Sequence, residues 1–326
     1  MKTILNRGSL LSIALVLLAA VIPLFTTSSY YQGLFILTFI WIVVNQGLNI
    51  ILGFTGYTSL VQGGLFGVGA YITAICATTF GMNVWSAALI AIAGNGLIAL
   101  TLALIVFRTS GHFFAILTLS MSLILDELFH NLAITGGNLG ISGVPGLFPS
   151  SWPRETYYYF VLAVMLLAIA FVAWLRKSRL GYGLRGIGSN DRLAASVGVP
   201  LYVYKTASFV LSALFAGVGG VLYVYFTGFV SPAPFNVAAS MACLLAVVIG
   251  GSGTLLGPVL GSILLVFLPA WLQNFQDYQL TIYGLAVILI IRFMPKGLVG
   301  LGRYFKRNKA VPKPAKTGGE EISLQR

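Results

Sequence analysis

The sequence predicts an all-α membrane protein that crosses the bilayer about ten times. Of its 326 residues, 58% are hydrophobic and only 8% are charged, whereas about a quarter of the residues in a soluble domain are charged. Such a chain cannot cover a water-facing surface. A membrane-spanning helix needs about 20 mostly apolar residues, and this chain has room for about ten. The two cysteines, Cys76 and Cys243, lie in apolar runs, so neither a disulfide framework nor a metal site is indicated, and no cofactor is expected.

Apolar runs separated by polar, glycine or proline residues define the candidate spans. The first run has a second interpretation as a cleavable signal peptide, because Lys2 and Arg7 precede it and polar residues 26–29 follow it. No clear cleavage site follows the run, which favours a retained helix. The ten spans lie near residues 9–25, 33–52, 59–80, 84–107, 113–132, 157–175, 206–226, 237–250, 257–272 and 280–293.

The basic residues predict the orientation of these spans. The net charge is +12, and cytoplasmic loops of membrane proteins are enriched in Lys and Arg. Even numbers of predicted spans separate the basic groups at the N-terminus, at Arg108, at residues 176–205 and from Arg292 onward, which leaves only Arg154 outside. Both termini are therefore expected in the cytoplasm. The positive charge is assigned to topology, so no nucleic-acid partner is expected.

The chain is predicted to hold one transmembrane domain, residues 1–302, followed by a basic cytoplasmic tail, residues 303–326. The tail has too few apolar residues to fold alone, so disorder is expected. It either binds anionic membrane lipid or remains solvated and reinforces the topology, and the second interpretation is favoured.

Two glycine-rich segments at membrane depth, residues 53–69 and 250–258, predict interrupted helices. A glycine inside a helix costs about 1 kcal/mol relative to alanine, and non-helical backbone survives in a membrane only where it is packed in protein or lines a water-filled cavity. Paired interruptions in the two halves of a chain indicate a substrate route, and close helix packing through small residues is the alternative. The predicted break residues are Gly53, Gly56, Gly63, Gly64, Gly250, Gly251, Gly253 and Pro258.

Polar residues within the spans have two possible roles. Asn45 and Asn49 share a helix face, with Gln46 beside them, and form either a substrate-facing stripe or an interhelical hydrogen-bond seam, which is favoured. Asp126 and Glu127 form either an outer-gate polar site or an interfacial cap. Positive helix ends at the breaks suit a substrate carboxylate. The predicted substrate path comprises Asn45, Asn49, Thr55, Ser59, Gln62, Ser252 and Thr254.

The cytoplasmic loop at residues 176–205 carries the signature of a short capped helix. Leu193 and Val197 lie one turn apart and form an apolar ridge. Such a ridge suits insertion into a groove of a partner protein, whereas an interfacial helix lying on lipid is the alternative. The signature comprises the N-cap Ser189 or Asn190, the first-turn acid Asp191, residues 193–197 and the stop Gly198.

Motifs for covalent chemistry are missing from the sequence. It contains no phosphate loop of the G-x-x-x-x-G-K-[ST] type and no H-E-x-x-H. No G-x-S-x-G nucleophile elbow lies between a strand and a helix. The chain is therefore not expected to be an enzyme, and any ATP must be bound by another chain.

Several stretches resemble, in order, one family of transport proteins. They are residues 47–56 (GLNIILGFTG), 59–60 (SL), 66–71 (FGVGAY), 114–119 (FAILTL), 135–137 (TGG), the loop from 178–181 (SRLG) to Gly198, 248–258 (VIGGSGTLLGP) and 295–300 (PKGLVG). Together they cover about residues 40–300 and resemble the LivM-type permease subunits of branched-chain amino acid importers of the ATP-binding-cassette class.

This resemblance implies a permease subunit in the bacterial inner membrane, with inverted repeats around the broken helices. It implies as partners a second similar permease, two cytoplasmic ATP-binding subunits and a periplasmic or lipid-anchored substrate-binding protein. The loop at residues 189–199 would be the coupling helix, with a degenerate E-A-A-x-x-x-G motif whose acid is displaced to Asp191. The residues expected to couple to the ATPase are Asp191, Arg192, Leu193, Ala194, Val197 and Gly198.

The substrate is less narrowly defined. Family members often carry a Glu and then a basic residue where this chain has Leu123 and Asp126. Branched-chain amino acids are the first expectation, and urea, short amides and aromatic acids are the alternatives. A different class of protein, an ion-coupled secondary carrier with Asp126 or Glu127 as its relay, leaves the capped helix unexplained.

Overall fold

A computed structural model describes residues 29–109, 111–149, 152–272, 284 and 297–300. The predicted span near 9–25, nearly all of the one near 280–293, and the tail 303–326 lie outside these residues. Every predicted span between 33–52 and 257–272 coincides with a helix. The helices are α2 (Ser29–Asn49), α3 (Gln62–Thr78), α4 (Val84–Val106), α5 (His112–Asn131), α6 (Arg154–Lys177), α7 (Arg179–Ser189), α8 (Asp191–Ser196), α9 (Leu201–Thr227), α10 (Val237–Gly250) and α11 (Gly257–Trp271).

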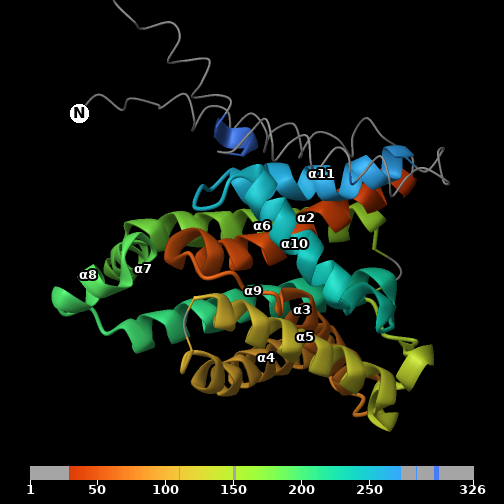
Figure 1. Ribbon diagram of the computed structural model, residues 1–326. Coiled ribbons are helices and arrows are strands. Elements are labelled where there is room, and N and C mark those ends of the chain that lie inside the picture. The colour runs from red at the N-terminus through yellow and green to blue at the C-terminus, as the bar shows by residue number, and fades with distance from the viewer. Residues whose placement is uncertain (1–28, 110, 150–151, 273–283, 285–296, 301–326) are drawn as a thin grey trace, which may run out of the picture.

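The long helices form a bundle, and the fold is that of an all-α polytopic membrane protein (Figure 1). Helix α9 runs through its centre, packed against α2, α3 and α4. Among the described residues, five helical segments are long and apolar enough to cross a membrane: Ser29–Thr55, Val84–Val106, Phe113–Asn131, Glu155–Lys177 and Leu201–Thr227. Helices α10 and α11 are apolar but shorter.

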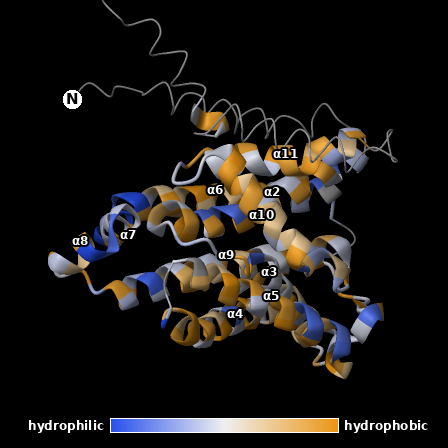
Figure 2. Ribbon diagram, viewed as in Figure 1, coloured by the Kyte–Doolittle hydropathy of each residue, from blue (hydrophilic) through white to orange (hydrophobic). Residues whose placement is uncertain are grey.

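The two ends of the bundle differ. Helices α7 and α8 project from one end, which is hydrophilic, whereas the bundle beside them is mostly hydrophobic (Figure 2). At the other end, strand β1 (Ile141–Ser142) pairs antiparallel with β2 (Phe229–Val230). Three short 3-10 helices accompany the strands: η2 (Ala133–Thr135), η3 (Gly137–Leu139) and η4 (Ala233–Phe235). We refer below to the α8 end and the strand end.

Small residues allow the central helices to approach closely. A side chain at Gly69 would lie 2.6 Å from the Cα of Gly217, so α3 and α9 touch backbone to backbone. Beside this contact, Asn95 of α4 donates a hydrogen bond of 2.7 Å to the carbonyl of Ala213. Helices in a membrane associate through such packing and hydrogen bonds, because lipid supplies no hydrophobic drive.

Helix α7 was not predicted. Residues 179–188 were expected to belong to the cytoplasmic loop, whereas they form a helix in the structure. Ser178 caps this helix, because its hydroxyl accepts a hydrogen bond from the amide of Gly181. Four glycines lower the helix propensity of this segment. Packing compensates, because a side chain at Gly188 would collide with the carbonyl of Phe54.

Candidate functional site

The first interruption separates α2 from α3. Helix α2 continues as a π-helix, η1 (Ile50–Thr55), which ends at Gly56 with a left-handed φ of 75°. Non-helical backbone then leads to α3. A π-helical turn within a helix often accompanies a functional site.

Gly63 and Gly64 were predicted as break residues, but both lie inside α3, after the interruption has ended. A side chain at Gly63 would lie 2.7 Å from the hydroxyl of Ser240, and one at Gly64 would lie 2.9 Å from Leu125. These two glycines therefore permit close packing, which corrects the predicted extent of the break.

The second interruption separates α10 from α11. Helix α10 ends at Gly250, and the backbone then turns through Gly251 (φ 117°) and Gly253 (φ 73°). The hydroxyl of Thr254 accepts a hydrogen bond of 3.0 Å from the amide of Gly257, where α11 begins. Pro258 lies in the first turn of α11, where its missing N–H costs no hydrogen bond.

The two interruptions meet in space although about 200 residues separate them. The side-chain amide of Asn49 accepts a hydrogen bond of 2.8 Å from the N–H of Gly253 and donates one of 2.9 Å to the carbonyl of Thr254. Gln46 donates a third, of 2.8 Å, to the carbonyl of Leu255. A side chain at Gly53 would collide with Gly253. Three polar backbone groups of the second break are thus satisfied by side chains of α2, as a non-helical segment inside a membrane would require.

The stripe of Asn45, Gln46 and Asn49 forms a seam between α2 and the second break. All three residues are fully buried. Asn45 donates a hydrogen bond of 2.9 Å to the hydroxyl of Ser262 in α11. Among the described residues, Asn45 Oδ1 and Gln46 Oε1 have no hydrogen-bond partner. This geometry matches the seam interpretation of the stripe.

Most polar groups of the other predicted path residues are also engaged internally. Gln62 donates to the carbonyls of Val44 (3.0 Å) and Ser212 (3.3 Å), and its oxygen accepts from the hydroxyl of Ser212. The Thr55 hydroxyl donates to the carbonyl of Ile51. Ser59 is buried in the first break, and Ser252 is exposed in the second.

Helix α8 confirms the predicted capped helix but is shorter, because it ends at Ser196. Asn190 is the N-cap, and its side-chain oxygen accepts hydrogen bonds from the amides of Arg192 (3.0 Å) and Leu193 (3.2 Å). Gly198 follows with a left-handed φ of 85°. Leu193 and Val197 are 64% and 74% exposed, so the apolar ridge faces outward.

Asp191 turns toward the bundle instead of outward. Its carboxylate is 2.6 Å from the ammonium of Lys205 in α9 and accepts a hydrogen bond of 2.6 Å from the hydroxyl of Tyr57 in the first break. Burial, followed by the hydrogen bond to Asp191, raises the pKa of Tyr57, so the phenol keeps its proton. No sequence motif singles out Tyr57, and Lys205 was expected only to contribute positive charge to the cytoplasmic loop.

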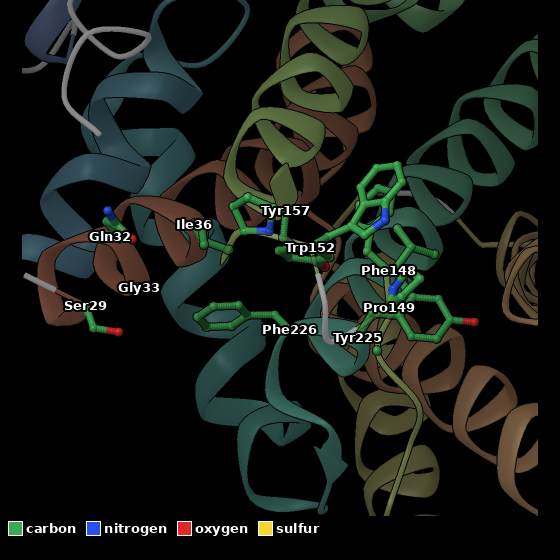
Figure 3. Close-up of a pocket in the computed structure, with 13 residues that line it drawn as sticks. Ser29, Gln32, Gly33, Ile36, Phe148, Pro149, Trp152, Tyr157, Tyr225 and Phe226 are labelled. Carbon is green, nitrogen blue, oxygen red and sulfur yellow. The ribbon is translucent and has the colours of Figure 1, made fainter. Parts of the chain in front are cut away.

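A cavity of about 580 Å³ lies at the strand end (Figure 3). Its size is typical of small-molecule sites. Tyr157 and Phe226 stack with ring centres 6.1 Å apart, and Phe148 stacks on Trp152 at 5.5 Å. The lining comes from α2, α6, α9 and the loop before α6: Ser29, Gln32, Gly33, Ile36, Gly146, Leu147, Phe148, Pro149, Trp152, Pro153, Tyr157, Tyr225 and Phe226.

The two acids of α5 differ in their surroundings. His130 lies close to Asp126, but its Nδ1 is hydrogen-bonded to the backbone carbonyl of Asp126, and Asp126 Oδ1 has no hydrogen-bond partner among the described residues. Glu127 accepts a hydrogen bond from the side chain of Asn131. Within the described ranges, no group of three or more His, Cys, Asp or Glu side chains could hold a metal ion. The exposed position of Glu127 and its bond to Asn131 match the interfacial-cap interpretation for that residue, and the role of Asp126 stays open between the two interpretations.

Long apolar helices with two interruptions that meet define a multi-pass membrane transport protein. A model of the family described as "Branched-chain amino acid transport system / permease component" matches residues 30–291. The chain is 30% identical to the high-affinity branched-chain amino acid transport system permease protein LivM of Escherichia coli (strain K12), over 91% of this chain and 76% of that protein. It is 24% identical to the corresponding protein LivH of the same strain, over 78% of this chain and 89% of that protein. No solved structure matches.

The chain therefore belongs to the branched-chain amino acid transport permease family. It is a membrane-embedded permease subunit of an ATP-binding-cassette importer.

Proposed function

We propose that this chain forms part of a translocation path for branched-chain amino acids in the bacterial inner membrane, and that separate ATP-binding subunits drive it through α8. The exposed ridge of Leu193 and Val197 is the observation that carries this proposal. Leu193 lies on the capped helix α8 and Val197 directly follows that helix, at the hydrophilic end of the bundle, where the ridge can enter a groove on a soluble partner.

In the proposed mechanism, closure of the ATP-binding subunits pushes α8 and moves the two interrupted segments relative to the rest of the bundle. The cavity then opens outward and receives substrate from a binding protein, and ATP hydrolysis restores the inward-facing state. A second similar permease completes the path. The proposal also includes ten membrane spans, two cytoplasmic termini and inverted repeats. The inverted repeats are supported by the presence of one helix interruption in each half of the chain.

The proposed substrate route begins in the aromatic cavity at the strand end and passes the junction of the two breaks. At that junction Asn45, Asn49, Gln62 and Thr254 hold backbone and neighbouring helices in place. Thr55, Ser59 and Ser252 lie on the interrupted segments themselves. The aromatic lining of the cavity favours a substrate with an apolar side chain over urea or a short amide.

The test is reconstitution of this chain with its partner permease, ATP-binding subunits and binding protein. ATP hydrolysis is then measured with leucine, urea and benzoate. Leucine is expected to stimulate hydrolysis most, and Leu193→Asp to abolish stimulation because it puts a charge on the docking ridge. Leu139→Asp, at a residue 86% exposed near the strand end, is the matched control.

Two results would change the proposal. Undiminished stimulation in Leu193→Asp would remove the coupling role of α8. Uptake driven by a proton gradient without ATP-binding subunits would instead support the ion-coupled carrier.

A further inference from the structure

Three polar side chains from separate segments meet beneath α8. Asp191 begins α8, Lys205 lies near the start of α9, and Tyr57 lies in the first break. The ammonium of Lys205 donates to both the carboxylate of Asp191 and the hydroxyl of Tyr57, while that hydroxyl donates to the carboxylate. Every pair in this triangle is therefore hydrogen-bonded.

Because Lys205 and Tyr57 are buried, the loss of any one of the three side chains would deprive a buried polar group of the other two of a hydrogen-bond partner. Lys205 and Tyr57 are each only 8% exposed. Removing a buried ammonium from water is costly unless an opposite charge and further hydrogen bonds accompany it. Here Asp191 supplies the opposite charge, and the ring of Tyr57 lies 4.4 Å from the ammonium. An exposed lysine would contribute equally well to the positive charge that keeps this loop in the cytoplasm. The orientation of the spans therefore does not explain why Lys205 is buried.

Tyr57 also connects the triangle to the helices behind it. Its ring meets Phe114 of α5 edge to face, with centres 5.1 Å apart, and Phe107, at the end of α4, at 6.2 Å. Phe107 in turn contacts Phe209 of α9. The break residue that binds Asp191 is therefore packed against the ends of two helices, α4 and α5, and is connected to α9 through Phe107.

A second contact between the α8 end and the first break is purely steric, and no hydrogen bond or ion pair accompanies it within the part of the chain that the structure describes. Gly188, near the end of α7, packs directly on the backbone of Phe54 and Thr55 in η1. A steric contact of this kind resists compression but not separation. Hydrogen bonds and an ion pair resist separation, so the triangle supplies what the Gly188 contact lacks.

We propose that Tyr57, Asp191 and Lys205 form a clamp that transmits outward movement of α8 to the break between η1 and α3. They are positioning residues for transport. A push from the ATP-binding subunits passes through the Gly188 contact, and the return movement is pulled through the clamp. This inference rests on the proposed role of α8 in docking those subunits.

The test uses the reconstituted complex and the compound that stimulates hydrolysis most in the unchanged protein. Tyr57→Phe removes a single hydroxyl and keeps the ring contacts. Transport is expected to fall about tenfold, the effect of losing one hydrogen bond to a charged group. ATP hydrolysis persists, so the ATP consumed per molecule transported rises by the same factor. Tyr202→Phe, at an exposed position in the first turn of α9, is the matched control.

A second pair of variants separates charge from shape. Lys205→Met breaks the ion pair and is expected to uncouple hydrolysis from transport, whereas Lys205→Arg restores both the charge and the coupling ratio. If Lys205→Met does not fold, Tyr57→Phe still decides the question.

Two outcomes would overturn the clamp. One is an unchanged coupling ratio in Tyr57→Phe. The other is loss of the ATP-binding subunits from that variant, which would assign Tyr57 to assembly. Neither affects the docking role of α8, which Leu193→Asp tests separately.

Discussion

At the scale of single residues, the side chain of Asn49 supplies the hydrogen bonds that a neighbouring helix or strand backbone would otherwise give to the second break. Its amide presents one acceptor and one donor, the same pair of groups that a peptide unit presents, and both engage the backbone of the second break. An apolar residue would leave the N–H of Gly253 and the carbonyl of Thr254 unsatisfied. A buried polar group without a partner costs about 1–3 kcal/mol.

Asn49→Leu is therefore expected to lower the free energy of unfolding by about 1–3 kcal/mol, since two partly buried backbone groups lose their partner. The shift is measured as a lower thermal unfolding midpoint of the purified protein in detergent. Asn131→Leu makes the same chemical change at an exposed position whose bonds go only to Glu127. Equal midpoints for the two variants would show that the junction does not depend on Asn49.

The sequence predicted this seam because Asn45 and Asn49 lie four residues apart in an apolar helix. It could not identify their partners, since Ser262 and residues 253–254 lie more than 200 positions away. The clamp was harder to predict. Tyr57 lies outside any polar motif, and Lys205 resembled the other basic residues of its loop until the fold brought Asp191 within 2.6 Å.

At the scale of elements, the helix that the sequence predicted, α8, is specified by local sequence signals, whereas the helix that was not predicted, α7, is stabilised by contacts with distant residues. Helix α8 was predicted because its signals are local: an Asn cap, an acid in the first turn and a glycine after the end. Helix α7 carries four glycines, and its stability depends on contacts with distant residues such as Phe54. Local propensity is therefore a poor guide to α7.

Two glycines of α7 make this dependence testable. Gly188→Ala is expected to impair transport, because the added carbon collides with the carbonyl of Phe54 and separates α7 from η1. Gly186→Ala is the matched control, since an added carbon there meets open space. It should instead stabilise the helix by about 1 kcal/mol.

The measurements are transport by the reconstituted complex and the thermal midpoint of each variant. Equal transport rates for Gly188→Ala and Gly186→Ala would mean that transport does not depend on close contact between α7 and η1. That result would contradict the proposal that the push from the ATP-binding subunits passes through Gly188.

At the scale of the whole molecule, the cavity and the docking ridge lie at opposite ends of the same three helices. Helices α2, α6 and α9 each contribute to the cavity at one end; at the other end α6 and α9 contact α7 directly, and α2 reaches α7 through its continuation η1. From Gly33 to Phe54 the helical path is about 30 Å at 1.5 Å per residue. A change confined to the cavity therefore leaves the docking surface intact, so the two functions can be tested independently.

Gly33 offers a way to fill the cavity without disturbing the helix. A side chain there points toward Phe226, and its first carbon makes an ordinary contact of 3.6 Å. Gly33→Leu extends further into the space that the substrate is proposed to enter, so transport is expected to fall several-fold while the ATP-binding subunits still co-purify. Gly33→Ala adds only the first carbon and should transport normally. Undiminished transport in Gly33→Leu would exclude the cavity from the substrate route and would direct attention to the junction of the two breaks alone.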